Sequence, residues 1–117
     1  ISMIAVSESF AMAEKLGLSA QNLFDITSSS SSQCWAMTSY LPVPGPVPAS
    51  PANNDYQPGF SGAMMAKDMK LARDAAISSG QKTELADSAL QMYERFLAEG
   101  GSSKDFSAIY NMINNSS

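Results

Sequence analysis

Residues 59–72 read Gly-Phe-Ser-Gly-Ala-Met-Met-Ala-Lys-Asp-Met-Lys-Leu-Ala. The two glycines favour a turn, and the residues after them keep helical spacing as far as Ser79, where Gly80 provides a stop. A line of apolar side chains follows one side of this helix: Met65, Met69, Ala72 and Ala76, flanked by Met64, Leu71 and Ala75. The stretch predicts a glycine-rich turn that leads into a long amphipathic helix over residues 61–79.

Four other segments also have helical patterns, over residues 1–16, 20–28 and 84–99 and after Ser103. Ser19, Thr83 and Ser103 are the expected capping residues of the last three segments. A helical turn or two is expected after Cys34, and no segment alternates as a strand does. The sequence therefore predicts an all-α domain of five or six helices.

The first helix is apolar on two nearly opposite sides, which is typical of a helix that runs through the middle of a domain. One side carries Met3, Val6, Phe10 and Ala13, and the other carries Ile1, Ile4, Ala5, Met12 and Leu16. Glu8 falls among apolar residues, so we expect a buried, hydrogen-bonded carboxylate there in preference to a catalytic one. No capping residue precedes this helix, which suggests a fragment of a longer polypeptide.

All six prolines fall between Pro42 and Pro58, a run that cannot form a regular helix and makes a poor strand. It is expected to form one long loop over the surface. Val43, Val47, Tyr56 and Phe60 are interleaved with the prolines or follow them, and they indicate a loop that docks onto the domain.

The composition limits the possible functions. The chain has 117 residues, 44% of them apolar and 15% charged, and a net charge of −4. This size fits a single domain, and the absence of a basic run argues against nucleic acid or an anionic membrane as a partner. Cys34 is the only cysteine and there is no histidine, so neither an internal disulfide nor a zinc site is expected. Cys34 and the eight methionines are interpreted as packing residues.

Lys67 and Asp68 are adjacent on the predicted long helix, about 100° apart around its axis. Asp68 falls at the edge of the apolar face, whereas Lys67 belongs to the polar side. One interpretation is a solvated lysine and an aspartate satisfied by a neighbouring helix. The other is that this face meets a second domain, where Asp68 would contact a polar substrate and Lys67 a cofactor.

Several stretches together resemble the C-terminal domain of the β-hydroxyacid dehydrogenase family, and in particular its 3-hydroxyisobutyrate dehydrogenases. The resemblance covers nearly the whole chain. It rests on these residues: Ile1-Ser2-Met3-Ile4 with Glu8 and Leu16-Gly17-Leu18, Cys34-Trp35 with Tyr40, Pro42-Val43-Pro44-Gly45, Asn53-Asn54 with Tyr56-Gln57, Gly59 to Asp68, and Asp105-Phe106-Ser107.

The resemblance implies the helical C-terminal domain of a 6-phosphogluconate-dehydrogenase-like fold over residues 1–117, without its N-terminal Rossmann NAD-binding domain. Lys67 corresponds to a lysine that contacts NAD across the cleft between the two domains. Phe60 and Asp68 correspond to residues that line the substrate end of that cleft. The family's catalytic lysine would precede Ile1, so no catalytic residue is expected within the chain.

By the same resemblance, the intact enzyme would oxidise 3-hydroxyisobutyrate with NAD to methylmalonate semialdehyde in valine catabolism, and this domain alone would be inactive. Implied partners are the Rossmann domain, a small 3-hydroxy acid and further copies in a homo-oligomer. The family is cytoplasmic in bacteria and lies in the mitochondrial matrix in eukaryotes. Two alternatives remain: the equivalent domain of a tartronate semialdehyde or glyoxylate reductase, and a non-catalytic helical interaction module. The choice between NAD and NADP is open.

Overall fold

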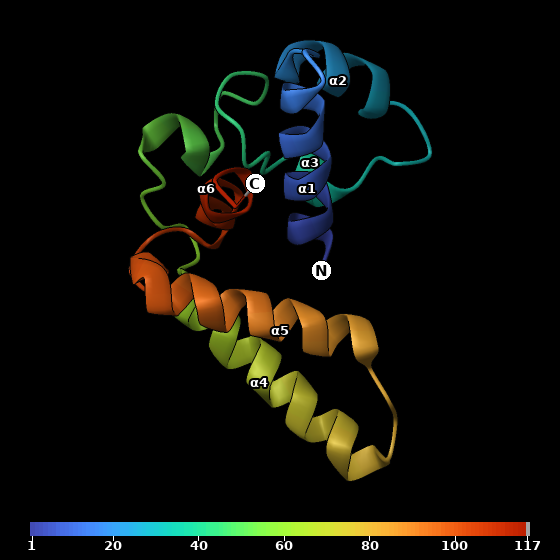
Figure 1. The fold of residues 1–117 in the computed structure, drawn as a ribbon, viewed down its shortest axis with the longest axis vertical. Coiled ribbons are helices and arrows are strands. Elements are labelled where there is room, and N and C mark those ends of the chain that lie inside the picture. Colours follow the sequence, from blue (N-terminus) through green and yellow to red (C-terminus); the bar gives the residue numbers. More distant parts are fainter. Residues whose placement is uncertain (117) are drawn as a thin grey trace.

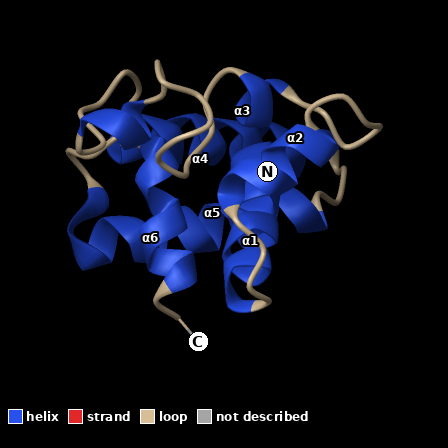
Figure 2. Ribbon diagram, turned by 90° about the horizontal axis from the view of Figure 1, so that it is seen from above, coloured by secondary structure: helices blue, strands red, loops and turns tan. Residues whose placement is uncertain are grey.

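The computed structural model describes residues 1–116, and within them the helices account for all the regular structure (Figure 1). The six α-helices are α1 Ser2–Lys15, α2 Ala20–Thr27, α3 Trp35–Thr38, α4 Gly62–Ser79, α5 Glu84–Phe96 and α6 Ile109–Asn114. Three short turns complete them: the 3-10 turns η1 Pro51–Asn54 and η3 Phe106–Ala108, and the π-helical turn η2 Leu97–Gly101. The all-α expectation is confirmed, and Figure 2 shows helices joined by loops without a strand in the described part.

The helices divide into a compact end and a projecting hairpin (Figure 1). Helices α1, α2, α3 and α6 gather at one end, and the antiparallel pair α4 and α5 extends from them. The described chain measures 43 × 30 × 27 Å, which reflects this projection. None of its helices has both the length and the apolar character that crossing a bilayer requires.

Local sequence signals explain the start of α2 and both ends of α4, whereas Thr83, the expected cap of α5, precedes that helix without a side-chain capping bond. Ser19 caps α2 by accepting a hydrogen bond from the Asn22 amide at 3.1 Å, and Ser61 caps α4 through the Met64 amide at 3.2 Å. Gly80 ends α4 with a φ of 74°, a conformation that glycine adopts without a steric penalty. The expected cap at Ser103 is wrong, because the last helical segment begins at η3 with Asp105 as its cap.

Helix α1 buries one of its two apolar sides fully and the other only at Ile4. Met3, Val6, Phe10 and Ala13 are buried against the core, as expected. On the opposite side Ile4 is buried in the core, whereas Ile1, Ala5, Met12 and Leu16 are exposed, because the neighbouring helices cover α1 mainly from one side. Glu8 lies on the exposed side, so the expectation of a buried carboxylate there is wrong.

Helix α4 packs through small residues. Gly62 and Ala66 are buried, and a Cβ atom at position 62 would lie 2.6 Å from the Gly101 carbonyl oxygen and 2.7 Å from the Phe96 ring. Only glycine allows this approach, which joins the start of α4 to the end of α5. The expected burial of Met64 and Leu71 is wrong: they are 54% and 59% exposed, because α5 covers the other side of α4.

The proline-rich loop docks onto the domain, as the sequence predicts. Pro42 is buried, and its carbonyl accepts a hydrogen bond from the Tyr56 hydroxyl at 2.7 Å. The Asn53 side chain accepts from the Gly45 amide at 2.9 Å and donates to the Val47 carbonyl at 2.8 Å. These bonds stabilise a loop that has almost no regular structure of its own.

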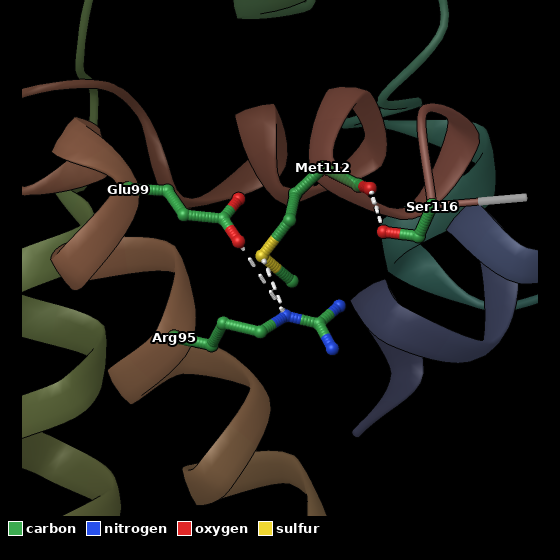
Figure 3. Close-up of polar contacts among 4 residues, drawn as sticks. All are labelled: Arg95, Glu99, Met112 and Ser116. Atoms are coloured by element: carbon green, nitrogen blue, oxygen red, sulfur yellow. Dashed lines mark hydrogen bonds and ion pairs between the residues drawn. The ribbon is translucent and has the colours of Figure 1, made fainter.

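Polar contacts also connect α5 to the C-terminal helix (Figure 3). The Arg95 Nε atom donates to the Met112 sulfur at 3.4 Å and lies 3.9 Å from a Glu99 carboxylate oxygen. The Met112 carbonyl also accepts a hydrogen bond from the Ser116 hydroxyl at 2.5 Å. The Arg95–Glu99 pair is half exposed, so we expect it to contribute little to stability.

Two isoleucines offer a matched test of the core. Ile109 has no exposed surface, whereas Ile77 near the end of α4 is 71% exposed. Ile109→Ala should lower the free energy of unfolding by about 2–5 kcal/mol, because it leaves a cavity. Ile77→Ala should change it by less than about 0.5 kcal/mol, since it removes few contacts. Urea unfolding of the two variants checks this, and equal losses would contradict the arrangement of the core.

Candidate functional site

Phe60 lies where the docked loop meets the start of α4. Its amide donates to an Asp105 carboxylate oxygen at 3.1 Å, and its carbonyl accepts from the Phe106 amide at 2.8 Å. Its half-buried ring meets the Phe106 ring edge-on, with 5.7 Å between the centroids and 83° between the planes. Both the backbone and the ring of Phe60 are therefore fixed by residues of the C-terminal segment.

The Phe60 ring is the end of a row of four aromatic side chains. Phe106 stacks on Tyr40 at 5.4 Å between ring centroids, and Tyr40 stacks on Trp35 at 4.9 Å. Phe106 is buried and Trp35 is 60% exposed, so the row runs from the core to the surface between these two rings. Such a row makes a rigid, largely apolar wall.

A hollow of about 310 Å³ lies beside this aromatic row. Its lining is mostly apolar and comes from α1, α3, α4, α5 and η3: Ile1, Ser2, Met3, Cys34, Trp35, Ala36, Met65, Tyr93 and Phe106. Cys34 is half-buried in this lining, in keeping with its interpretation as a packing residue. A second hollow, of about 210 Å³, lies between α1 and α5 and has no part in the aromatic row.

Lys67 and Asp68 lie in the second turn of α4, and both side chains are exposed. Asp68 is the sixth residue after Gly62, which places it roughly 9 Å along the helix from the α4 start. Within residues 1–116 neither side chain forms an ion pair or a side-chain hydrogen bond, so the interpretation that a neighbouring helix satisfies Asp68 is wrong. Both charges are available to a partner outside the described residues.

The surroundings of Tyr40 keep its hydroxyl group protonated. Burial raises the pKa of Tyr40 well above its usual value, and the hydrogen bond to the Asp105 carboxylate and that group's negative charge raise it further. Tyr40 therefore acts as a donor, over 2.7 Å, to an Asp105 oxygen. No group of three or more His, Cys, Asp or Glu side chains within the described residues could hold a metal ion.

The exposed side of α4 carries both a positively charged and a negatively charged side chain, Lys67 and Asp68. The exposed Lys67 ammonium could donate to phosphate, ribose or carboxamide oxygens of a cofactor. The sequence has no Gly-x-Gly-x-x-Gly, the turn that holds the pyrophosphate in Rossmann domains. These residues could therefore contact the cofactor but could not hold all of it.

Sequence reasoning from spacing singled out Lys67 and Asp68, whereas the resemblance supplied the role of Phe60. It assigned no role to Trp35 or Tyr40, which the structure stacks in the same row as Phe60. One sequence feature could have pointed to these two residues. Trp35 is the only tryptophan, and it lies five residues before Tyr40, shortly ahead of the proline-rich loop. Nothing in the sequence indicates that Tyr40 and Phe106 meet.

Nearly the whole chain matches one protein family and its members. Residues 1–113 match the family described as "NAD-binding of NADP-dependent 3-hydroxyisobutyrate dehydrogenase". A probable 3-hydroxyisobutyrate dehydrogenase of Mycobacterium tuberculosis is 48% identical over 113 residues, which are 97% of this chain and 38% of the relative. The mitochondrial 3-hydroxyisobutyrate dehydrogenase of Drosophila melanogaster is 42% identical over 113 residues, covering 97% of this chain and 35% of the relative.

Solved structures agree with these sequence matches. Mycobacterium tuberculosis 3-hydroxyisobutyrate dehydrogenase with L-serine superposes with a TM-score of 0.92 at 48% identity, over 96% of this chain and 38% of that one. The Salmonella typhimurium 3-hydroxyisobutyrate dehydrogenase has a TM-score of 0.75 at 20% identity and supports the fold alone. The chain spans little more than a third of its relatives' length and matches their C-terminal part.

The four tyrosines predict a loss of stability at high pH. Burial raises the pKa of Tyr56 to about 12 and is also the main cause of the raised pKa of Tyr40, Tyr93 and Tyr110. The unfolded chain loses its phenolic protons near the ordinary value of about 10. The stabilisation is therefore complete below about pH 10 and is lost as the pH rises towards about 12.

Phenolate absorbance and urea unfolding at about pH 9 and about pH 11 measure this effect, since the two values lie on either side of the ordinary tyrosine pKa. The folded chain should show little phenolate absorbance at the higher pH, and its free energy of unfolding should be lower there. Titration of all four tyrosines near pH 10 in the folded chain would contradict the burial described above.

Proposed function

The chain belongs to the 3-hydroxyisobutyrate dehydrogenase family, and on this basis we propose that residues 1–117 are the C-terminal domain of an NAD-dependent 3-hydroxyisobutyrate dehydrogenase. An N-terminal Rossmann domain is its first partner, and the exposed side of α4 with the aromatic row closes one side of the cleft between the two. The observation that carries this proposal is that Lys67 and Asp68, on the helix that follows Phe60, are exposed and have no side-chain partner within residues 1–116.

In the proposed reaction, 3-hydroxyisobutyrate becomes methylmalonate semialdehyde, a step of valine catabolism. A bound nicotinamide dinucleotide supplies the two-electron acceptor for this oxidation. Lys67 donates hydrogen bonds to cofactor oxygens, and Phe60 with the rings behind it keeps water from the reacting carbon. The hydroxyl proton goes to a lysine outside this chain, so the isolated chain is inactive.

The negative charge of Asp68 limits which part of the substrate it can contact. The substrate carries a carboxylate, which a second carboxylate at close range repels. Asp68 therefore faces the hydroxyl end of the substrate, where it can accept a hydrogen bond. This arrangement orients the substrate with its own carboxylate away from α4.

The remaining parts of the proposal concern cofactor, assembly and location. The description of the matching family names an NADP-dependent enzyme, so assays must compare NADP with the NAD proposed here. The exposed apolar side of α1 and the 73% exposed Leu85 on α5 offer surface for a homo-oligomer. The relatives are bacterial or mitochondrial, and we place the enzyme in the cytoplasm or the mitochondrial matrix accordingly.

The alternatives considered from the sequence are not favoured. The relatives reported above carry the name 3-hydroxyisobutyrate dehydrogenase, not tartronate semialdehyde or glyoxylate reductase. A non-catalytic helical module would not explain a match over residues 1–113 to a dehydrogenase family.

A chimera tests the roles of Lys67 and Asp68. This chain replaces the matching segment of the Mycobacterium tuberculosis relative, which supplies the N-terminal part. Lys67→Ala should raise the KM for the cofactor about 10- to 100-fold, because it removes a charge-assisted contact. Asp68→Ala should lower kcat about 100-fold, because the substrate is no longer oriented.

Lys70→Ala and Asp74→Ala are the matched controls, since both residues are exposed on the same helix. Both should leave kcat and KM within about twofold of the parent, as expected away from the site. Steady-state kinetics with the hydroxy acid and each cofactor gives all these values. Lys67→Ala and Asp68→Ala variants that match their controls would refute the cleft-lining roles.

A further inference from the structure

Asp105 is a carboxylate with no exposed surface, and five donors surround it. One oxygen accepts from the Tyr40 hydroxyl at 2.7 Å, the Gly59 amide at 3.0 Å and the Phe60 amide at 3.1 Å. The other oxygen accepts from the amide and the hydroxyl of Ser107. Within residues 1–116 no Lys or Arg forms an ion pair with Asp105, so neutral groups alone satisfy it.

Helix capping accounts for the hydrogen bonds of only one of the two Asp105 carboxylate oxygens. The oxygen that binds Ser107 caps the turn η3, a role that a serine or asparagine side chain also fills. The other oxygen makes no contact with that turn, and its three donors lie 45, 46 and 65 residues away in sequence. A carboxylate is needed because both oxygens must accept at once.

The second oxygen acts on the segment that carries the candidate site. Gly59 and Phe60 directly precede Ser61, which caps α4, and Lys67 and Asp68 follow on the same helix. Backbone bonds hold the segment from both sides: the Asp105 amide donates to the Tyr56 carbonyl at 2.9 Å, and the Gly62 amide donates to the Lys104 carbonyl at 2.8 Å. The carboxylate fixes the residues between these two bonds.

Gly59 shows how closely the groups are packed. A Cβ atom at this position would lie 2.6 Å from the Tyr40 hydroxyl oxygen and 3.9 Å from the Asp105 oxygen. The same hydroxyl belongs to a ring that stacks on both Trp35 and Phe106. One carboxylate oxygen thus binds both the backbone of Gly59 and Phe60 and the hydroxyl of Tyr40, whose ring lies in the middle of the aromatic row.

We propose that Asp105 is a positioning residue for the cleft, which holds Phe60, Tyr40 and the start of α4 in one fixed arrangement. This inference rests on the proposed function, because it gives Phe60 and the aromatic row their place beside the substrate. Asp105 itself has no exposed surface, so it acts on the cleft only through these neighbours.

Amide hydrogen exchange in the 117-residue chain tests the positioning independently of catalysis. Asp105→Ser retains an acceptor for the Ser107 amide but none for Gly59 and Phe60. Exchange at the Gly59 and Phe60 amides should become about tenfold faster or more, relative to the core amide of Tyr93. In the control Ser107→Ala, which alters only the capping side, these two amides should stay within about twofold of the parent.

Kinetics of the chimera then test the consequence for the site. Asp105→Ser should raise the KM for the hydroxy acid or lower kcat by about tenfold. The KM for the cofactor should change less, because Asp105 binds the Gly59 and Phe60 amides directly and reaches Lys67 only through α4. Ser107→Ala should leave all these constants near the parent values. Unchanged protection of Gly59 and Phe60 in Asp105→Ser would overturn the positioning role.

Lost protection with unchanged kinetics would overturn the link between Asp105 and the cleft. A chimera without activity would refute the proposed function, whereas the exchange experiment would still decide what Asp105 holds. If Asp105→Ser does not fold, Gly59→Ala tests the same arrangement by displacing the Tyr40 hydroxyl. Its Phe60 amide should exchange about tenfold faster, and parent-like exchange would overturn the inference.

Discussion

The arrangement of this domain depends on the hydrogen bonds that the buried carboxylate of Asp105 accepts. A carboxylate without solvent must have its oxygens satisfied by donors, and here the donors come from three separate segments. The loop after α3, the end of the proline-rich loop and the start of η3 converge on one point for this reason. The end of the long loop is therefore anchored to the domain, although it lacks the repeating hydrogen bonds of a helix.

A steric constraint complements this electrostatic one. Gly62 and Gly101 bring the backbones of α4 and η2 into contact with the Phe96 ring, at distances that exclude a larger side chain. The hairpin of α4 and α5 thereby leaves the compact end in a defined direction (Figure 1). The second turn of α4, which carries Lys67 and Asp68, belongs to this projecting hairpin.

The charged groups divide into those used internally and those left free. Asp105 is buried and fully hydrogen-bonded, and Glu14 accepts from Tyr110 and Asn114 at 2.8 and 3.2 Å. These carboxylates serve the fold. Lys67 and Asp68 have no such partners within residues 1–116, and they lie on exposed surface next to Met64 and Leu71. A surface of this kind suits a domain that closes over a ligand together with a second domain.

The sequence by itself determined the helices, because caps such as Ser19 and Ser61 and stops such as Gly80 act over a few residues. The sequence also indicated Lys67 and Asp68 as candidate site residues, because helical spacing places both on one helix. Only the tertiary structure decided which apolar faces are buried, so that Glu8 and Met64 are exposed against expectation. Helical periodicity shows that a face is apolar but does not show which element covers it. The same limit applies to Asp105 and Tyr40, since contacts across 65 residues leave no local pattern.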